Sequence, residues 1–241
     1  RKTLEKEKNV EIETIPHLFW DAVKRRQQKT AMREKDLGIW QTISWEKYGL
    51  QARNTGLALY SLGLKKGEVV SIASEGNPEW LYTDMGAIGA GGISSGVYTT
   101  DSAAQVKYLV NDSKTKFYFA ENEEQLDKIL EVRSECPTLE KIIVYDMEGL
   151  HNFSDSQVMS YDDFINIGVE LHSKQPDLWI DLMNQVEPGD IAILVYTSGT
   201  TGPPKGAMIS NQNILYNIRA SKEVFGTAEG ENQLSFFPLC H

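Results

Sequence analysis

Short strand-like segments recur at a nearly constant interval between residues 69 and 145, and this repeat constrains the fold more than any other feature of the sequence. Residues 69–73, 93–97, 116–120 and 141–145 follow one another about every 24 residues, with helical patterns between them. Asn77-Pro78-Glu79 begins one such helix, because proline at a first-turn position loses nothing by lacking an N–H. Strands that alternate with helices at this interval predict an α/β fold, in which right-handed crossovers build a parallel sheet.

The segments around this repeat carry signals for further elements. Apolar residues at helical spacing predict helices after Thr14, with Pro16 in the first turn, after Ser44, and from Ser210 to about Phe225. A short helix is expected to begin at Ser160-x-x-Asp163 and another at residues 177–183, and strands are expected at residues 40–44, 191–195 and 234–237. The glycines between Gly86 and Gly96 predict a helix with small side chains that lies close on the sheet.

The beginning of the chain differs from the rest. Residues 1–9 are charged and aperiodic, and residue 1 is arginine rather than methionine. We expect a charged leader here, the end of a longer N-terminal region, followed by one folded domain over residues 10–241.

One glycine-rich stretch, Tyr196-Thr197-Ser198-Gly199-Thr200-Thr201-Gly202-Pro203-Pro204-Lys205-Gly206, directly follows an apolar strand. Its hydroxyl side chains and glycines leave the backbone free to direct several N–H groups toward one anion, and the small side chains let a phosphate approach closely. Lys205 adds a positive charge beside that anion. The stretch is therefore predicted to be a phosphate-binding loop that joins two extended segments.

Two better-known phosphate motifs do not match. A Walker A loop would need glycine where Pro204 stands and Ser or Thr where Gly206 follows Lys205. A dinucleotide fingerprint would need a third glycine where Ser94 stands, and the residues before it are predicted to be helical. The chain is therefore neither a P-loop NTPase nor a dinucleotide-binding protein by these signatures.

The eleven residues resemble the phosphate-loop signature of the adenylate-forming superfamily, which includes acyl-CoA synthetases, luciferases and peptide-synthetase adenylation domains. Other stretches resemble long-chain acyl-CoA synthetases of the bubblegum type and extend the resemblance over nearly the whole chain. They are Thr14-Ile-Pro-His-Leu-Phe, Asn77-Pro-Glu-Trp80, Ala90-Gly-Gly-Ile93, Gly96-Val-Tyr-Thr-Thr100 and Glu124-Gln-Leu-Asp-Lys-Ile-Leu130. The resemblance implies a parallel-sheet, βαβ-wound large N-terminal domain of an AMP-binding enzyme, in incomplete form.

The same resemblance implies an activity and a set of site residues. A fatty-acid carboxylate would attack ATP to give acyl-adenylate and pyrophosphate, and CoA would then displace AMP. Thr197, Ser198, Gly199, Thr200, Thr201, Gly202, Pro203, Pro204, Lys205 and Gly206 would bind the phosphates. His241 resembles the histidine of the Pro-Leu-x-His motif and would border the acyl site.

Some expected parts of such an enzyme are missing from the sequence. The Tyr-Gly-x-Thr-Glu segment that stacks adenine and places Mg²⁺ does not occur, nor does the small C-terminal domain with the adenylation lysine. We therefore expect the 241 residues alone to be inactive or nearly so. Two alternatives stay open: a truncated product that binds only nucleotide or a partner, and a synthetase for another carboxylic acid.

Composition limits the partners. The formal net charge of −10 and the dispersed basic residues argue against an extended nucleic-acid surface. Two cysteines without metal-ligand spacing fit a reducing compartment, so we expect a cytoplasmic protein. No apolar run is long enough to cross a membrane, so any membrane contact, for example at the endoplasmic reticulum, would be peripheral. The sequence carries no signal for a particular oligomeric state.

Overall fold

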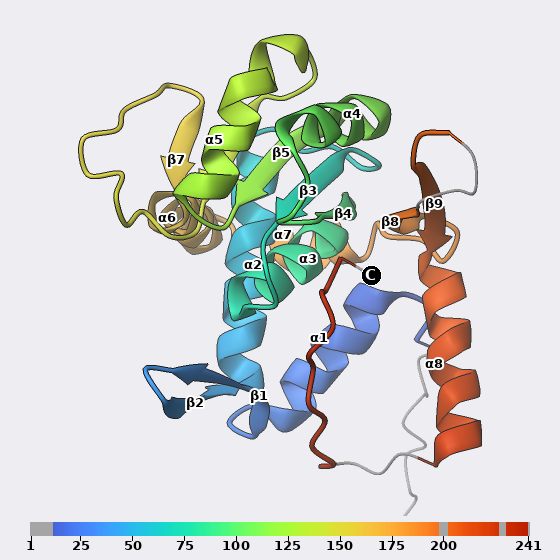
Figure 1. Ribbon diagram of the computed structural model, residues 1–241. Helices are drawn as coiled ribbons and strands as arrows, with labels where there is room; N and C mark the ends of the chain where they lie inside the picture. The colour runs from blue at the N-terminus through green and yellow to red at the C-terminus, as the bar shows by residue number, and fades with distance from the viewer. Residues whose placement is uncertain (1–11, 198–201, 227–229, 241) are drawn as a thin grey trace, which may run out of the picture.

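A computed structural model describes residues 12–197, 202–226 and 230–240 (Figure 1). In these ranges seven strands form a central sheet in the order β7-β6-β5-β3-β4-β8-β9. The strands are β3 (Val69–Ala73), β4 (Ile93–Val97), β5 (Thr115–Ala120), β6 (Lys141–Val144), β7 (Val158–Ser160), β8 (Ile191–Thr197) and β9 (Lys205–Ser210). Every neighbouring pair from β7 to β8 is parallel, and β8 pairs with β9 in antiparallel orientation. The predicted α/β class and parallel sheet are confirmed, with one antiparallel edge strand.

Helices cover both faces of this sheet. Apolar side chains of α4 (Ala103–Ser113) and α5 (Glu123–Val132) pack against one face. Those of α2 (Trp45–Ser61), α3 (Pro78–Gly89) and α6 (Tyr161–Lys174) pack against the other. Because both faces are covered, every residue of the inner strands β3 and β5 is buried, as is typical of parallel sheets.

The helices begin where short polar side chains can satisfy free backbone N–H groups. The Asn77 side chain accepts a hydrogen bond of 2.9 Å from the backbone N–H of Trp80 at the start of α3. Ser102 and Gln105 form a reciprocal capping box at the start of α4, and the turn η1 (Arg133–Glu135) follows α5. These local signals placed the predicted helix starts to within a residue or two, because capping depends on neighbours in the sequence.

The small residues of α3 and its C-cap face two sides: Ala87 and Ala90 pack in the cluster on the sheet, as predicted, whereas two glycines face other helices. A β carbon on Gly86 would lie 2.7 Å from the carbonyl oxygen of Ala52 on α2, and one on Gly89 would overlap the ring of Trp179. Trp179 belongs to the short helix α7 (Leu178–Met183) and is almost fully buried. The two glycines therefore let α3 approach α2 and α7, in addition to its predicted packing on the sheet.

A smaller unit precedes the sheet. Helix α1 (Ile15–Arg26) leads into an antiparallel hairpin of β1 (Thr30–Asp36) and β2 (Ile39–Ser44). Phe19 and Ile43 pack with aromatic residues of α2 and α3 in a separate apolar cluster. The helix and β2 were predicted; β1 was missed because its residues are mostly polar or charged and lie largely on the surface.

The last part of the chain corrects one prediction. Helix α8 (Asn211–Phe225) follows β9 as expected, but residues 234–237 form no strand. Phe236 and Phe237 are 73% and 69% exposed, so this apolar run contributes to neither the sheet nor the core of the described structure. Apolar content alone misled the prediction, because a strand also needs a neighbouring strand to pair with. No described helix is both long and apolar enough to cross a membrane.

Candidate functional site

The predicted phosphate loop lies between the last two strands of the sheet. Thr197 and Lys205 are the final register pair of the β8–β9 hairpin, so the loop occupies the turn at its tip. Gly202 has a φ of 92°, a left-handed conformation that favours glycine. Ser198, Gly199, Thr200 and Thr201 lie outside the described residues. The predicted arrangement of two extended segments joined by the loop is confirmed.

The cation and the last glycine of the loop, Lys205 and Gly206, lie on its outgoing strand. Lys205 is exposed, and among the described residues it has no ion-pair partner, so its charge is free to meet an anion. A β carbon on Gly206 would stand 3.1 Å from the ring of Tyr196, with which it is paired across the hairpin. Glycine at this position lets the two ends of the loop lie close together. Pro203 is exposed and Pro204 is half-buried.

The loop leaves the sheet at the edge where α/β proteins bind ligands. From β3 the chain passes to β4 on one side and then crosses to β5 on the other, so the direction of strand order reverses at β3. Ligands of open α/β sheets bind outside the carboxyl ends of the strands at such a reversal. Strand β8 is the parallel neighbour of β4, so the loop that follows β8 belongs to the same edge.

The end of the chain packs near this edge as well. Leu239 contacts the apolar cluster that contains Val70 and Ile72, and Cys240 is buried against Gly96 of β4. Burial raises the pKa of the Cys240 thiol. His241, predicted to border the acyl site, lies outside the described residues, but the residue before it is anchored one strand away from the phosphate loop.

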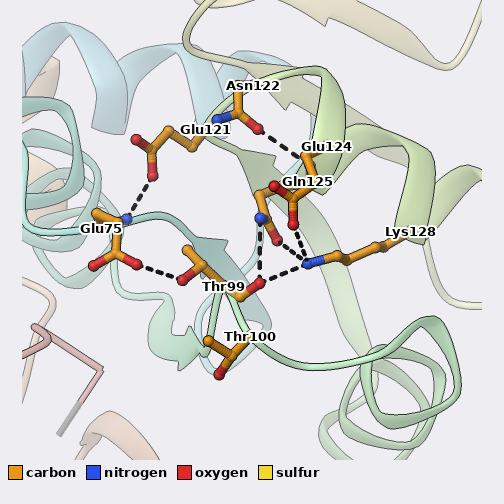
Figure 2. A pocket seen from close by; sticks show the side chains of 8 residues that line it. All are labelled: Glu75, Thr99, Thr100, Glu121, Asn122, Glu124, Gln125 and Lys128. Carbon is orange, nitrogen blue, oxygen red and sulfur yellow. Dashed lines mark hydrogen bonds and ion pairs between the residues drawn. The ribbon is translucent and has the colours of Figure 1, made fainter.

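A polar cavity of about 450 Å³ opens at the carboxyl ends of β3, β4 and β5 (Figure 2). Its charged lining consists of Glu75, Glu121, Glu124 and Lys128. The backbone N–H of Glu75 donates to the Glu121 carboxylate at 2.6 Å, and Lys128 Nζ donates to the carbonyl oxygen of Thr99 at 2.6 Å. These groups bind one another across the ends of three strands, so they fasten the loops beside the phosphate loop.

Sequence reasoning did not find this cavity. Thr99 and Thr100 stand in one stretch that carried the family resemblance, and Glu124 and Lys128 of α5 stand in another, whereas Glu75 and Glu121 come from two further loops. The lining residues lie close together only because β3, β4 and β5 are neighbours in the sheet. Among the described residues, no group of three or more His, Cys, Asp or Glu side chains could hold a metal ion.

Comparison with known proteins agrees with this geometry. Residues 19–241 match the AMP-binding enzyme family. The chain is 31% identical over 232 residues to the rat long-chain-fatty-acid–CoA ligase ACSBG1, covering 95% of this chain and 32% of that protein. It is 33% identical over 231 residues to human long-chain-fatty-acid–CoA ligase ACSBG2, covering 95% of this chain and 34% of that protein. It thus spans about a third of the length of these relatives.

Solved structures share the fold. The anthranilate CoA ligase AuaEII in complex with anthranoyl-AMP matches with a TM-score of 0.68 at 23% identity, over 88% of this chain and 37% of its own. VinN in complex with 3-methylaspartate matches with a TM-score of 0.66 at 19% identity, over 89% of this chain and 52% of its own. The match over residues 19–241, together with the strand order and the loop at the carboxyl edge, places this chain in the AMP-binding enzyme family.

Proposed function

We propose that the whole protein carrying this chain activates a long-chain fatty acid with ATP and transfers the acyl group to CoA. The observation that carries the proposal is the loop at residues 196–206. It combines the superfamily's phosphate-loop sequence with a position at the carboxyl edge of the sheet, beside the reversal of strand order. The relatives' names support fatty acid as the substrate class.

The reaction requires that the reacting groups be held in position and that the developing negative charge be stabilised. A carboxylate oxygen forms a bond to the α-phosphorus of ATP while the bond to pyrophosphate breaks. The thiol of CoA then attacks the acyl carbon, AMP leaves, and a thioester remains. Negative charge builds on the phosphoryl oxygens and on the departing pyrophosphate, so fixed N–H groups and a cation lower the barrier.

The residues of this chain suit the pyrophosphate end of that reaction. We assign the β- and γ-phosphates to Thr197, Ser198, Gly199, Thr200, Thr201 and Gly202, and we assign the neutralising charge to Lys205, whose ammonium is exposed at the exit of the loop. Pro203 and Pro204 restrict the backbone before Lys205, and Gly206 keeps the exit close to Tyr196. His241 would border the acyl group. No described residue is assigned to Mg²⁺.

The substrate class can be tested by product formation. The whole protein would be incubated with ATP, Mg²⁺, CoA and one acid at a time: palmitate, acetate, an aromatic acid or an amino acid. We expect palmitoyl-CoA and AMP in stoichiometric amounts, with much less product from the other three acids. Preferential turnover of another acid would support acyl-CoA formation but overturn the assignment of fatty acid as the substrate. If no acid gave a thioester, the proposal that the protein ligates acids to CoA would be contradicted.

A further inference from the structure

We propose that two residues of α4, Tyr108 and Asp112, hold the two ends of the phosphate loop and act as positioning residues for ATP. They stand four positions apart, so both project from the same side of the helix. One binds the strand that enters the loop, and the other binds the backbone that leaves it. The inference rests on the proposed function, because it concerns the same loop.

The entry of the loop is held through Tyr196. Its hydroxyl donates a hydrogen bond of 2.8 Å to Oδ2 of Asp112, and its ring is buried in the cluster between the sheet and α4. Burial raises the pKa of Tyr196, and the Asp112 carboxylate raises it further. The hydroxyl therefore keeps its proton and stays a donor throughout the physiological pH range.

The exit of the loop is held through Pro204. The Tyr108 hydroxyl donates a hydrogen bond of 2.8 Å to the carbonyl oxygen of Pro204, directly before Lys205. Proline has no N–H, so the carbonyl group is the main means by which the protein can bind this residue's backbone. The contact joins residues 96 positions apart, and it fixes the point from which the Lys205 side chain starts.

Helix α4 is itself firmly placed, as a support must be. Its first turn is closed by the capping box of Ser102 and Gln105, and Val106, Leu109 and Val110 are buried against the sheet. On another side, Lys107 Nζ lies 3.0 Å from the Glu135 carboxylate after α5. Because α4 is held at its start and along its buried side, Tyr108 and Asp112 keep a fixed position relative to the sheet. The two ends of the loop that they bind are therefore held as well.

The consequence is that the two ends of the loop, at Tyr196 and Pro204, are held in place before ATP arrives. Backbone N–H groups and a cation act on a phosphate most strongly when they need no reorganisation on binding. Loss of either hydrogen bond to α4 should weaken the use of ATP and leave recognition of the fatty acid unchanged. By contrast, substitution of a residue that only stabilised the fold would change KM for ATP and KM for palmitate together, or would change neither of them.

The test compares variants of the whole protein. Tyr108→Phe removes one hydrogen bond and Asp112→Ala the other, whereas Asp112→Asn keeps an oxygen that can accept from Tyr196. Tyr161→Phe is the matched control, because it removes a buried hydroxyl that lies 3.2 Å from Thr55 Oγ1 on the other face of the sheet. Amide hydrogen exchange over residues 196–206 is measured without ligands, and KM for ATP and for palmitate are measured separately.

We expect Tyr108→Phe and Asp112→Ala to speed exchange in the loop and raise KM for ATP, each by about three- to tenfold, the size of one hydrogen bond. KM for palmitate should not change, and Asp112→Asn and Tyr161→Phe should resemble the wild type in all three measurements. Unchanged loop exchange in both loss variants would overturn the inference. Wild-type protein without acid-dependent ATP turnover would overturn the proposed function instead, and the exchange data would still decide whether α4 holds the loop.

Discussion

The backbone of Cys240 lies directly over Gly96: a β carbon on Gly96 would stand 2.5 Å from the Cα atom of Cys240. No side chain fits in that space, so glycine at this position of β4 lets the last described residues reach the sheet. Cys240 is 8% exposed as a result. The contact joins the end of the chain to the strand beside the one that carries the phosphate loop.

Gly96→Ala should therefore displace residues 238–240 and expose the Cys240 thiol. Labelling with a maleimide, followed by peptide mapping, should show Cys240 reacting at least severalfold faster than in the wild type. Cys136, which is buried in the apolar cluster that α4 and α5 form with the sheet, reports global unfolding in the same sample and should stay protected. Gly189→Ala is the matched control, because a β carbon there meets nothing within 4 Å. Equal labelling of Cys240 in the wild type and in Gly96→Ala would show that the contact does not hold this segment.

Asp84 of α3 gives the fold a dependence on pH. The side chain is buried, and among the described residues its Oδ1 has no hydrogen-bond partner. Burial raises the pKa of Asp84 to about 6, while the Ser94 hydroxyl nearby opposes the shift. The folded protein therefore binds this proton more tightly than the unfolded chain does, so the contribution to stability is present near pH 4 and is lost as the pH rises through about 6.

Asp84→Asn removes the charge while keeping the shape, and should stabilise the protein at pH 7.5 by an amount on the order of 1–3 kcal/mol. Urea denaturation at several pH values between 4 and 7.5 measures the difference between the variant and the wild type. That difference should shrink toward pH 4, where the aspartic acid is largely neutral. A difference that did not vary with pH would mean that Asp84 does not titrate in this range.

Sequence patterns predicted the local elements of the fold well. Capping signals such as Asn77 and Ser102 act within four residues, and apolar strands buried on both faces show little alternation, so both can be recognised from the chain alone. The loop at residues 196–206 was also predicted, with its flanking extended segments. The prediction of a strand at residues 234–237 was wrong, because whether a segment pairs with a neighbouring strand does not depend on its own residues alone.

The arrangement around the loop could not be predicted in the same way. The hydrogen bond between Tyr108 and Pro204 and the contact between Gly96 and Cys240 join residues roughly a hundred or more positions apart. Neither contact has a signal at its own position in the sequence. They follow from the placing of β4 beside β8, which brings distant segments to one edge of the sheet.

Lys205 should be needed for ATP and not for folding. Replacing it with alanine removes one charge-assisted contact, worth about 1.5–3 kcal/mol, and should lower kcat/KM for ATP about ten- to a hundredfold in the whole protein. Its melting temperature should stay within about a degree of the wild type, because the side chain is exposed and has no described ion-pair partner. Lys222→Ala, an exposed lysine of α8, is the matched control and should not change the kinetics. Wild-type kinetics in Lys205→Ala would remove Lys205 from the phosphate site.

The central claim is that the loop serves the formation of an acyl-adenylate, and exchange of labelled pyrophosphate into ATP tests it most directly. The whole protein would be incubated with ATP, Mg²⁺, labelled pyrophosphate and palmitate, without CoA, so that only the first half-reaction can proceed. Reversal of adenylation should return label to ATP only when the acid is present, and Lys205→Ala should reduce the rate. Label that entered ATP equally well without any acid, or did not enter it with palmitate or any other carboxylic acid, would contradict the account.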